Sequence, residues 1–328
     1  MTGSLAKCVV VGGAGAVGRM FVELLTQAAA SVTVIDSRVG AGVPPQGPGD
    51  SGNEAGFASL GEAIAGDVTA PSNELCRALR AADLVLLAVP ERVALAALAA
   101  VTAQMRDGAL LAHTASVQLP LALAMRDTAQ RLQALGLNPM FAPALGMRGR
   151  PVAAVVVNDG ASVGELLGLV SQAGARVVPV DAETHDRVCA AGQALAHATV
   201  LSFALALTAM DVDLRMMRAL APPPLATLLA LVARIVSGAP TVYWEIQSEN
   251  RYAAGARGAL ARGLEHLAQA TQDEAAFTSV MKRSRGFLGP ELEPLGDYCA
   301  ELFSVAGNAP ATARSAGGPP RTAEERER

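Results

Sequence analysis

The sequence predicts an α/β protein in which a doubly wound parallel sheet precedes an all-helical domain. Two observations lead to this fold class. Strand and helix signals alternate up to about residue 180, which is typical of a parallel sheet covered by helices. From Glu183 to about Val305 apolar residues recur at helical spacing, and no strand signal is longer than a few residues. The expected boundaries are 1–180, 181–306, and a polar tail at 307–328 that we expect to be disordered.

The first predicted strand, 9–11, leads into Gly13-x-Gly15-x-x-Gly18 and then into a helix-forming stretch. Glycine at these spacings permits a tight turn at Gly13, close approach of a pyrophosphate at Gly15, and close helix packing at Gly18. The free N–H groups at the start of the helix can bind phosphate. The motif therefore predicts a Rossmann-type dinucleotide site, and its expected residues are Gly13, Ala14, Gly15, Val17 and Gly18.

The second predicted strand, 31–35, is followed by Asp36. A carboxylate at this place can bind both hydroxyls of an adenine ribose and repels a 2′-phosphate. Arg38 could hold such a phosphate, but the repulsion from Asp36 favours NAD over NADP as the cofactor.

The remaining elements of the first domain follow in order. A Gly- and Pro-rich segment at 37–56 predicts a surface loop. The later elements are a strand at 66–68, a helix capped by Ser72, a strand at 83–89, a helix at 91–105, a strand at 109–113, a helix at 120–135, a strand at 152–157, a helix at 162–172 and a strand at 175–180. Val89 and Pro90 lie at the carboxyl end of a strand, where a cofactor binds such sheets, and are expected to contact it.

Composition excludes several classes of function. The chain has 328 residues and a net charge of −4 without a basic cluster, which argues against a nucleic-acid partner. Its four cysteines form no CxxC pair, so we expect reduced thiols in the cytoplasm and no metal site. The segment before the first strand is too short for a secretory signal. The apolar stretch 194–210 contains polar residues and is shorter than the roughly 20 residues of a membrane span, so we expect a buried or interface helix and no membrane partner.

Four further segments carry residues suited to catalysis. They are Ala115-Ser-Val117, Asn138-Pro-Met-Phe-Ala-Pro143, the pair His185-Asp186 with Gln193 to His197, and Tyr243 to Arg251. In this order they resemble the prephenate dehydrogenase family, whose members oxidatively decarboxylate prephenate or arogenate with NAD(P). The resemblance runs from about residue 7 to residue 305. It implies a nucleotide-binding first domain and a helical second domain that forms a homodimer.

The resemblance also implies roles for single residues. Ser116 would lie between the nicotinamide and the substrate ring, although Gln118 stands where a lysine is usual. Arg251 would bind a substrate carboxylate, because a guanidinium offers two parallel charge-assisted bonds. His197 would point into the substrate pocket, and Gln193 on the same helix would bind substrate as well.

Simpler interpretations stay open for these residues. Arg251 could form a surface salt bridge, His197 could be a hydrogen-bonded core residue, and the His185 pair could cap a helix. Arg148 and Arg150 follow the Asn138 segment on a predicted loop. Either could bind the second carboxylate of the substrate, with Arg148 the named candidate, or both could be solvated.

Asn138 stands where the family usually has histidine. Histidine can accept the proton of the substrate's 4-hydroxyl as hydride leaves C4 and CO2 departs, whereas an amide cannot. Losing a positioned base costs about 10²- to 10⁴-fold, so we expect poor turnover of prephenate. A 4-amino group carries its own lone pair and needs no base in that step, and Asn138 can accept its N–H. The pattern resembles the branch of the family that converts 4-amino-4-deoxyprephenate to 4-aminophenylpyruvate for p-aminophenylalanine-containing antibiotics.

Three other functions stay open. The chain could be a prephenate or arogenate dehydrogenase of tyrosine biosynthesis in which water or His197 replaces the missing base. It could be a non-catalytic NAD-binding dimer, but the presence of Ser116, His197 and Arg251 argues against this. It could be a β-hydroxyacid dehydrogenase, which would need a lysine that 185–211 lacks.

Overall fold

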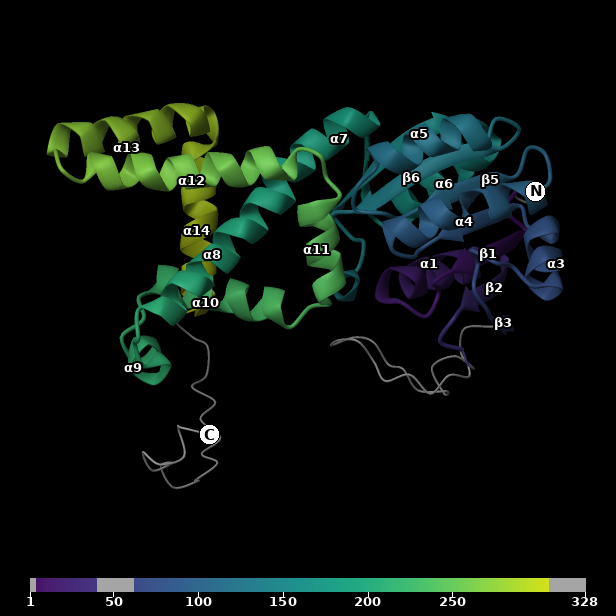
Figure 1. Cartoon of the computed structure of the whole chain (residues 1–328), viewed down its shortest axis with the longest axis horizontal. Coiled ribbons are helices and arrows are strands. Elements are labelled where there is room, and N and C mark those ends of the chain that lie inside the picture. The colour runs from purple at the N-terminus through teal and green to yellow at the C-terminus, as the bar shows by residue number, and fades with distance from the viewer. Residues whose placement is uncertain (1–3, 40–61, 307–328) are drawn as a thin grey trace, which may run out of the picture. The chain divides into compact units, whose positions relative to one another are not determined.

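The computed structural model describes residues 4–39 and 62–306 (Figure 1). Most of the loop predicted at 37–56 and the whole tail predicted at 307–328 lie outside these residues.

An eight-stranded sheet forms the N-terminal part of the chain, in the order β3-β2-β1-β4-β5-β6-β7-β8. Neighbouring strands are parallel, as predicted, except that β7 runs antiparallel to β6. The central strands are buried along their length, which is why their sequences are continuous apolar runs. The strands are β1 (Lys7–Val11), β2 (Ser31–Asp36), β3 (Glu62–Ala65), β4 (Leu84–Leu87), β5 (Leu110–His113), β6 (Gln133–Pro139), β7 (Pro151–Asn158) and β8 (Arg176–Pro179).

Helices cover both faces of the sheet (Figure 1). Along β1, Val10 joins the core beneath α1 and α6, whereas Val9 joins the core beneath α3, α4 and α5, because successive side chains point to opposite faces. The sheet is therefore the wall between two apolar cores. The helices are α1 (Ala16–Gln27), α3 (Asn73–Ala81), α4 (Glu91–Gln104), α5 (Leu119–Thr128) and α6 (Ala161–Gln172).

Two predicted elements of this region are wrong. The strand expected at 66–68 ends earlier, at Ala65, where it pairs with Asp36. The helix expected at 120–135 ends at Thr128, and Gln133–Pro139 forms β6 instead. The apolar sequence of β6 is compatible with a helix or a buried strand. It forms a strand because it pairs with β5 on one side and β7 on the other. The predicted cap is confirmed, since Ser72 Oγ accepts from the Leu75 amide.

Only helices follow β8 in the described part of the chain, as predicted. They are α7 (Ala182–Cys189), the π-helical segment η2 (Ala190–Leu195), α8 (Ala196–Ala209), α9 (Leu214–Ala219), α10 (Pro223–Val236), α11 (Pro240–Ser248), α12 (Ala253–Ala270), α13 (Glu274–Leu288), the short 3-10 helix η3 (Gly289–Glu291) and α14 (Leu292–Ala306). Contacts group the chain into two compact units, 1–205 with 232–266 and 206–231 with 267–328. The domain boundary expected at residue 181 stays a prediction.

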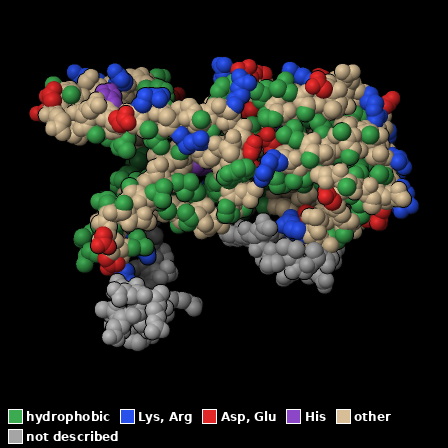
Figure 2. All heavy atoms as spheres, in the orientation of Figure 1, with side chains coloured by type: hydrophobic (Ala, Val, Ile, Leu, Met, Phe, Trp, Pro, Cys, Tyr) green, Lys and Arg blue, Asp and Glu red, His purple; other side chains and the backbone are tan. Residues whose placement is uncertain are grey.

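The helical region exposes many apolar side chains, some of which are visible in Figure 2. Helix Ala182–Ala209 contains an 18-residue window with a mean hydropathy of 1.5, of which 28% is buried, so its length and composition would allow a membrane span. The pair Pro223–Val236 and Pro240–Ser248 passes the same test together but is bent by 97°. Core and interface helices of soluble proteins have the same composition. The exposed apolar surface is therefore a candidate for contact with another protein surface.

Candidate active site

The turn after β1 places the predicted dinucleotide loop at the carboxyl end of the sheet. Gly12 in this turn has a left-handed backbone conformation, with a φ of +77°. A Cβ at Gly12 would lie 2.3 Å from the Ala88 carbonyl oxygen, and one at Gly13 would lie 2.7 Å from Val34 Cγ1. The tight turn expected at Gly13 is thus made at Gly12. The signal that could have revealed it is the pair of consecutive glycines after the strand.

Gly15 is the N-cap of α1, and no side chain caps this helix or places an acid in its first turn. A Cβ at Gly15 would come no closer than 3.3 Å to another atom, the Gly12 oxygen. Arg38 Nη2 lies 3.7 Å from the same Cβ position, so a side chain here would narrow the approach of a ligand to the backbone. Val17, half-buried in the first turn of α1, lies beside Gly15. This arrangement fits a pyrophosphate held by helix N–H groups.

Asp36 connects the loop to the end of β2. Its Oδ2 accepts the Ala14 amide at 3.1 Å, and its Oδ1 accepts the backbone amide of Arg38 at 3.0 Å. The Arg38 guanidinium pairs with the same carboxylate at 3.1 Å. Asp36 is buried and keeps a fixed orientation. Val89 and Pro90 follow β4 after Ala88, at the same edge of the sheet, and are half-buried and exposed respectively.

A second group of polar residues lies where β6 meets α7. Asn138 is the sixth residue of β6 and is 2% exposed, and its Nδ2 lies 3.0 Å from His185 Nε2. His185 Nδ1 lies 2.8 Å from Asp186 Oδ1. Both members of the pair are buried on α7. The structure thus joins residues that stand 47 positions apart in the sequence.

Asp186 also fixes the loop that carries Ser116. Its Oδ1 accepts the Gln118 amide at 2.8 Å and its Oδ2 accepts the Leu119 amide at 2.9 Å. Ser116 itself is half-buried two residues before Gln118. One carboxylate therefore links the loop after β5 to the histidine that contacts Asn138.

The Gln118 side chain is fully buried. Its Nε2 donates to the Ala115 carbonyl at 2.7 Å. A Cβ on Gly136 of β6 would lie 1.9 Å from Gln118 Oε1 and 2.8 Å from His113 Nε2. Glycine is therefore required beneath these two side chains. Burial and, secondarily, the nearby His185 lower the pKa of His113 to about 3, so this ring stays neutral.

Gln193 reaches the Asn138 segment from η2. Its Nε2 lies 4.0 Å from the sulfur of Met140, which also lies 4.0 Å from Cys189 Sγ. Gln193 Oε1 is buried and has no hydrogen-bond partner. Single π-helical turns occur frequently at functional sites, and this one brings the Gln193 side chain to Met140 of the Asn138 segment.

His197 follows one helical turn after Gln193, at the start of α8. Its Nδ1 is buried without a partner, and its ring packs edge-on against Tyr243 with centroids 4.9 Å apart. Burial, together with the nearby Arg234, lowers the pKa of His197, so the imidazole is neutral near neutral pH. A neutral ring with an unpaired nitrogen is compatible with contact to a substrate, and this role of His197 stays a prediction.

The predicted arginines do not join this group. Arg251 is 63% exposed, lies 3.7 Å from Glu183 and packs over the Tyr252 ring. Arg148 is exposed. Arg150 donates to the carbonyls of its own loop, with Leu145 the nearest at 2.7 Å. The surface salt bridge considered for Arg251 is therefore present, and Arg150 braces the loop.

Sequence reasoning missed Glu91, the first residue of α4 after Pro90. It is 3% exposed, and its Oε2 has no hydrogen-bond partner. Burial first, and then the nearby carboxylates of Glu249, Asp186 and Glu245, raise its pKa to about 7. Near neutral pH this group titrates next to the predicted cofactor segment.

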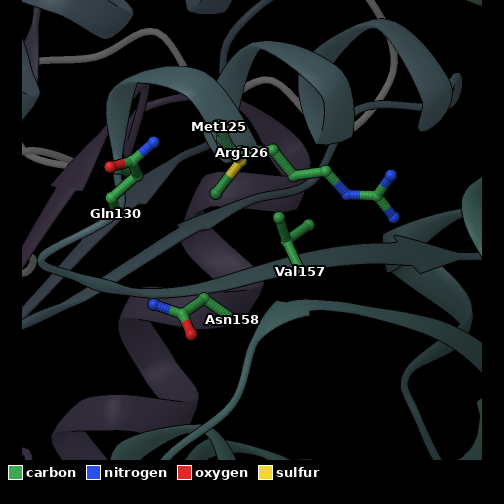
Figure 3. Close-up of a pocket in the computed structure, with 6 residues that line it drawn as sticks. Met125, Arg126, Gln130, Val157 and Asn158 are labelled. Carbon is green, nitrogen blue, oxygen red and sulfur yellow. The ribbon is translucent and has the colours of Figure 1, made fainter.

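A separate small pocket lies at the end of β7 near the C-terminus of α5 (Figure 3). It contains none of the predicted site residues and no group that titrates near neutral pH. Its lining residues are Met125, Arg126, Ala129, Gln130, Val157 and Asn158. Among residues 4–39 and 62–306, no three His, Cys, Asp or Glu side chains are placed to hold a metal ion.

Comparisons with known proteins identify relatives of this chain. Residues 181–283 match the prephenate dehydrogenase dimerization domain. The chain is 48% identical over 301 residues to the 4-amino-4-deoxyprephenate dehydrogenase of Streptomyces pristinaespiralis, covering 91% of this chain and 97% of that protein. It is 23% identical over 227 residues to a probable arogenate/prephenate dehydrogenase of Methanocaldococcus jannaschii, covering 67% and 51% of the two chains.

Solved structures show the same fold. Prephenate dehydrogenase of Aquifex aeolicus, in complex with hydroxyphenyl propionate and NAD+, superposes with a TM-score of 0.67 at 17% identity, covering 87% of this chain and 98% of that one. Synechocystis arogenate dehydrogenase superposes with a TM-score of 0.60 at 16% identity, covering 85% and 98%.

Proposed function

Because this chain belongs to the prephenate dehydrogenase family, we propose that it is an NAD-dependent oxidoreductase that converts 4-amino-4-deoxyprephenate to 4-aminophenylpyruvate. This assignment makes it an enzyme of p-aminophenylalanine and antibiotic biosynthesis. The observation that carries the substrate assignment is Asn138, buried in the site where the family usually has histidine. The 48% identity to an enzyme named for the same amine supports it.

The reaction balances without a general base on the ring nitrogen. The neutral amine lone pair at C4 expels a hydride from that carbon and forms an iminium. The C1–carboxylate bond then breaks, CO2 leaves, and its electron pair makes the ring aromatic and returns the nitrogen to an amine. Bound NAD supplies the acceptor for the hydride. Asn138 contributes an amide that hydrogen-bonds the amine without competing for its lone pair.

The cofactor loop fits NAD in three respects. Gly15 leaves the backbone at the N-terminus of α1 without a Cβ, no side chain caps the amides at the start of that helix, and Asp36 offers a buried carboxylate. These residues would hold the pyrophosphate and the adenine ribose. Gly13, Ala14 and Gly18 shape the loop, and Val89 and Pro90 would contact the nicotinamide end.

The remaining site residues have roles that follow from their positions. Ser116 would donate a hydroxyl between nicotinamide and substrate, held in place by the Asp186 loop contacts. His197 and Gln193 would face the substrate with their unpaired atoms. Arg251 would exchange its Glu183 contact for a substrate carboxylate, and Arg148 would bind the second one. The exposure of both arginines is compatible with this.

We also infer a homodimer, since residues 181–283 match a dimerization domain and the helices there expose apolar side chains. The four free cysteines support a cytoplasmic location, because oxidising compartments favour disulfides. Neither nucleic acid nor membrane is part of the proposed function.

The experiment is a parallel assay of the purified protein, with NADH formation followed by absorbance and two substrates offered at equal concentration. We expect strong turnover of 4-amino-4-deoxyprephenate and turnover of prephenate lower by about 10²-fold or more. Equal or faster turnover of prephenate would contradict this substrate assignment and favour a prephenate dehydrogenase of tyrosine biosynthesis. No turnover of either substrate, with NAD still bound, would contradict the proposed function and favour a non-catalytic NAD-binding protein.

A further inference from the structure

We propose that His185 and Asp186 are positioning residues that hold the Asn138 side chain in one of its two amide orientations, with Oδ1 toward the 4-amino group of the substrate. This inference rests on the proposed function for the identity of the substrate. The hydrogen bonds that determine the orientation of the Asn138 amide do not involve the substrate.

The hydrogen atoms of this group can be placed from its acceptors. Both oxygens of Asp186 accept backbone amides, from Gln118 at 2.8 Å and from Leu119 at 2.9 Å. The carboxylate is therefore an acceptor for its third neighbour as well, and His185 Nδ1, 2.8 Å away, must carry the hydrogen. In the neutral imidazole, Nε2 then has a lone pair and no hydrogen.

That lone pair decides the orientation of Asn138. An amide nitrogen can donate to Nε2. An amide oxygen could not, because its lone pairs would repel the lone pair of Nε2. Asn138 Nδ2 lies 3.0 Å from His185 Nε2, as this argument requires. Oδ1 accepts no hydrogen bond from the described residues, and it is not among the fully buried unpaired atoms, so it borders accessible space.

The neighbours of the histidine ring leave little room for another arrangement. His185, Asp186 and Asn138 are each at most 3% exposed, so bulk water does not compete for these bonds. Cys189 Sγ lies 3.4 Å from His185 Nε2. Burial, with Asp186 nearby, raises the pKa of this thiol to about 12, so it stays an S–H, which can donate to Nε2 or to the Met140 sulfur 4.0 Å away.

The consequence is chemical selectivity at the 4-position. Asn138 presents only an acceptor, which takes an N–H of the amine and leaves the nitrogen lone pair free to expel hydride. The opposite orientation would present an N–H to that lone pair and withdraw it from the reaction. An amide oxygen also cannot remove the proton that a 4-hydroxyl must lose. His185 and Asp186 thus act on the substrate through Asn138.

Nitrogen NMR of the ¹⁵N-labelled protein tests the orientation without any substrate. The chain has four histidines, so each imidazole can be assigned by substitution. We expect His185 to carry its hydrogen on Nδ1, and a hydrogen-bonded Asn138 NH2 group that exchanges slowly. A hydrogen on His185 Nε2 would overturn the proposal, whatever the enzyme's activity.

Kinetics of two variants test the function of the pair. Glutamine in His185→Gln can donate to Asp186 with Nε2 and accept from Asn138 with Oε1, so it keeps the donor–acceptor order. We expect it to retain kcat within about threefold, whereas His185→Leu loses about tenfold or more in kcat with a smaller change in KM. His266→Leu, at an exposed position on α12, is the matched control.

The outcomes separate this inference from the proposed function. If the wild-type enzyme turns over the amine and His185→Leu does so at the same kcat, the positioning role is refuted and the function stands. If both histidine variants lose activity equally, the order of donors and acceptors is irrelevant and the proposal also fails. If the wild type is silent on the amine, the proposed function fails, and the NMR result alone decides the orientation.

Discussion

Gly18 packs so closely against Gly12 that a Cβ at position 18 would lie 2.2 Å from the Gly12 carbonyl oxygen and 2.7 Å from Gly13 Cα. Both neighbours are backbone atoms and cannot rotate away. The close approach brings the N-terminus of α1 directly over the turn that follows β1. Two glycines six residues apart thus fix the place where the pyrophosphate would bind.

Gly18→Ala therefore displaces α1 from the loop. We expect NAD affinity to fall by about tenfold or more and the protein to lose roughly 1–3 kcal/mol of stability through overpacking. Calorimetric titration with NAD and urea unfolding measure the two effects. Gly164→Ala on α6 is the control, because a Cβ there meets nothing within 4 Å. Unchanged NAD affinity in Gly18→Ala would contradict the assignment of this loop.

Asp36→Asn keeps an oxygen that can accept the Ala14 amide but removes the charge beside Arg38. Without that charge, the repulsion of a 2′-phosphate is lost, and the Arg38 guanidinium can bind this phosphate. We expect kcat/KM for NAD to fall by about tenfold and that for NADP to rise by a similar factor. Steady-state kinetics with both cofactors measure this. Glu23→Gln on α1 is the control and should leave the cofactor preference unchanged. If Asp36→Asn also leaves it unchanged, Asp36 does not bind the adenine ribose.

Asn138→His restores the residue usual in the family beside His185. The imidazole can accept a proton from a 4-hydroxyl, so turnover of prephenate should rise by about 10²-fold. Turnover of the amine should fall by at least about tenfold, since a protonated ring repels developing positive charge. Asn138→Leu separates this exchange from simple damage, because it should lower both activities. Prephenate turnover that stays low in Asn138→His would show that other residues set the specificity.

The sequence could predict the elements that rely on local pattern. The run before Gly13 and the alternation up to residue 180 suffice for the sheet, because buried parallel strands have continuous apolar sequences. The sequence pattern did not predict β6, because Gln133 to Leu137 is apolar enough for either a helix or a strand. Pairing with the neighbouring strands determines that this segment is a strand. The antiparallel direction of β7 has no local signal.

The site was predictable only in part. Asn138 and His185 were named from segments whose order resembles a family, but their 3.0 Å contact depends on how α7 packs against the end of β6. No spacing rule predicts such a contact. The burial of Glu91 and Gln118 is equally a property of the assembled fold, because both residue types are usually exposed.

Leu264→Glu tests the inferred homodimer. Leu264 lies on α12 within the matched dimerization region, and its side chain is 68% exposed in the single chain. If a partner covers it, a buried carboxylate should raise the dimer dissociation constant by about tenfold or more, as measured by sedimentation equilibrium. Leu123→Glu on α5 is the control, since this leucine is also 49% exposed but lies outside that region. A wild-type monomer would contradict the dimer itself.

Glu91 makes the stability of the protein depend on pH. Burial raises its pKa from 4.5 to about 7 in the folded chain, so between these values the folded state holds a proton that the unfolded state has released. The free energy of unfolding must therefore fall as pH rises through this interval. Glu91→Gln keeps the shape and removes the charge, so its stability relative to wild type should increase with pH.

Urea unfolding at about pH 5 and about pH 8 measures this difference. We expect Glu91→Gln to gain on the order of 1 kcal/mol relative to wild type between the two conditions, because the wild-type carboxylate becomes charged among Glu245, Glu249 and Asp186. Glu265→Gln, at an exposed position on α12, should show no such gain. If both variants follow the wild-type pH dependence, Glu91 stays ionised or solvated in the folded protein, and the carboxylate cluster does not raise its pKa.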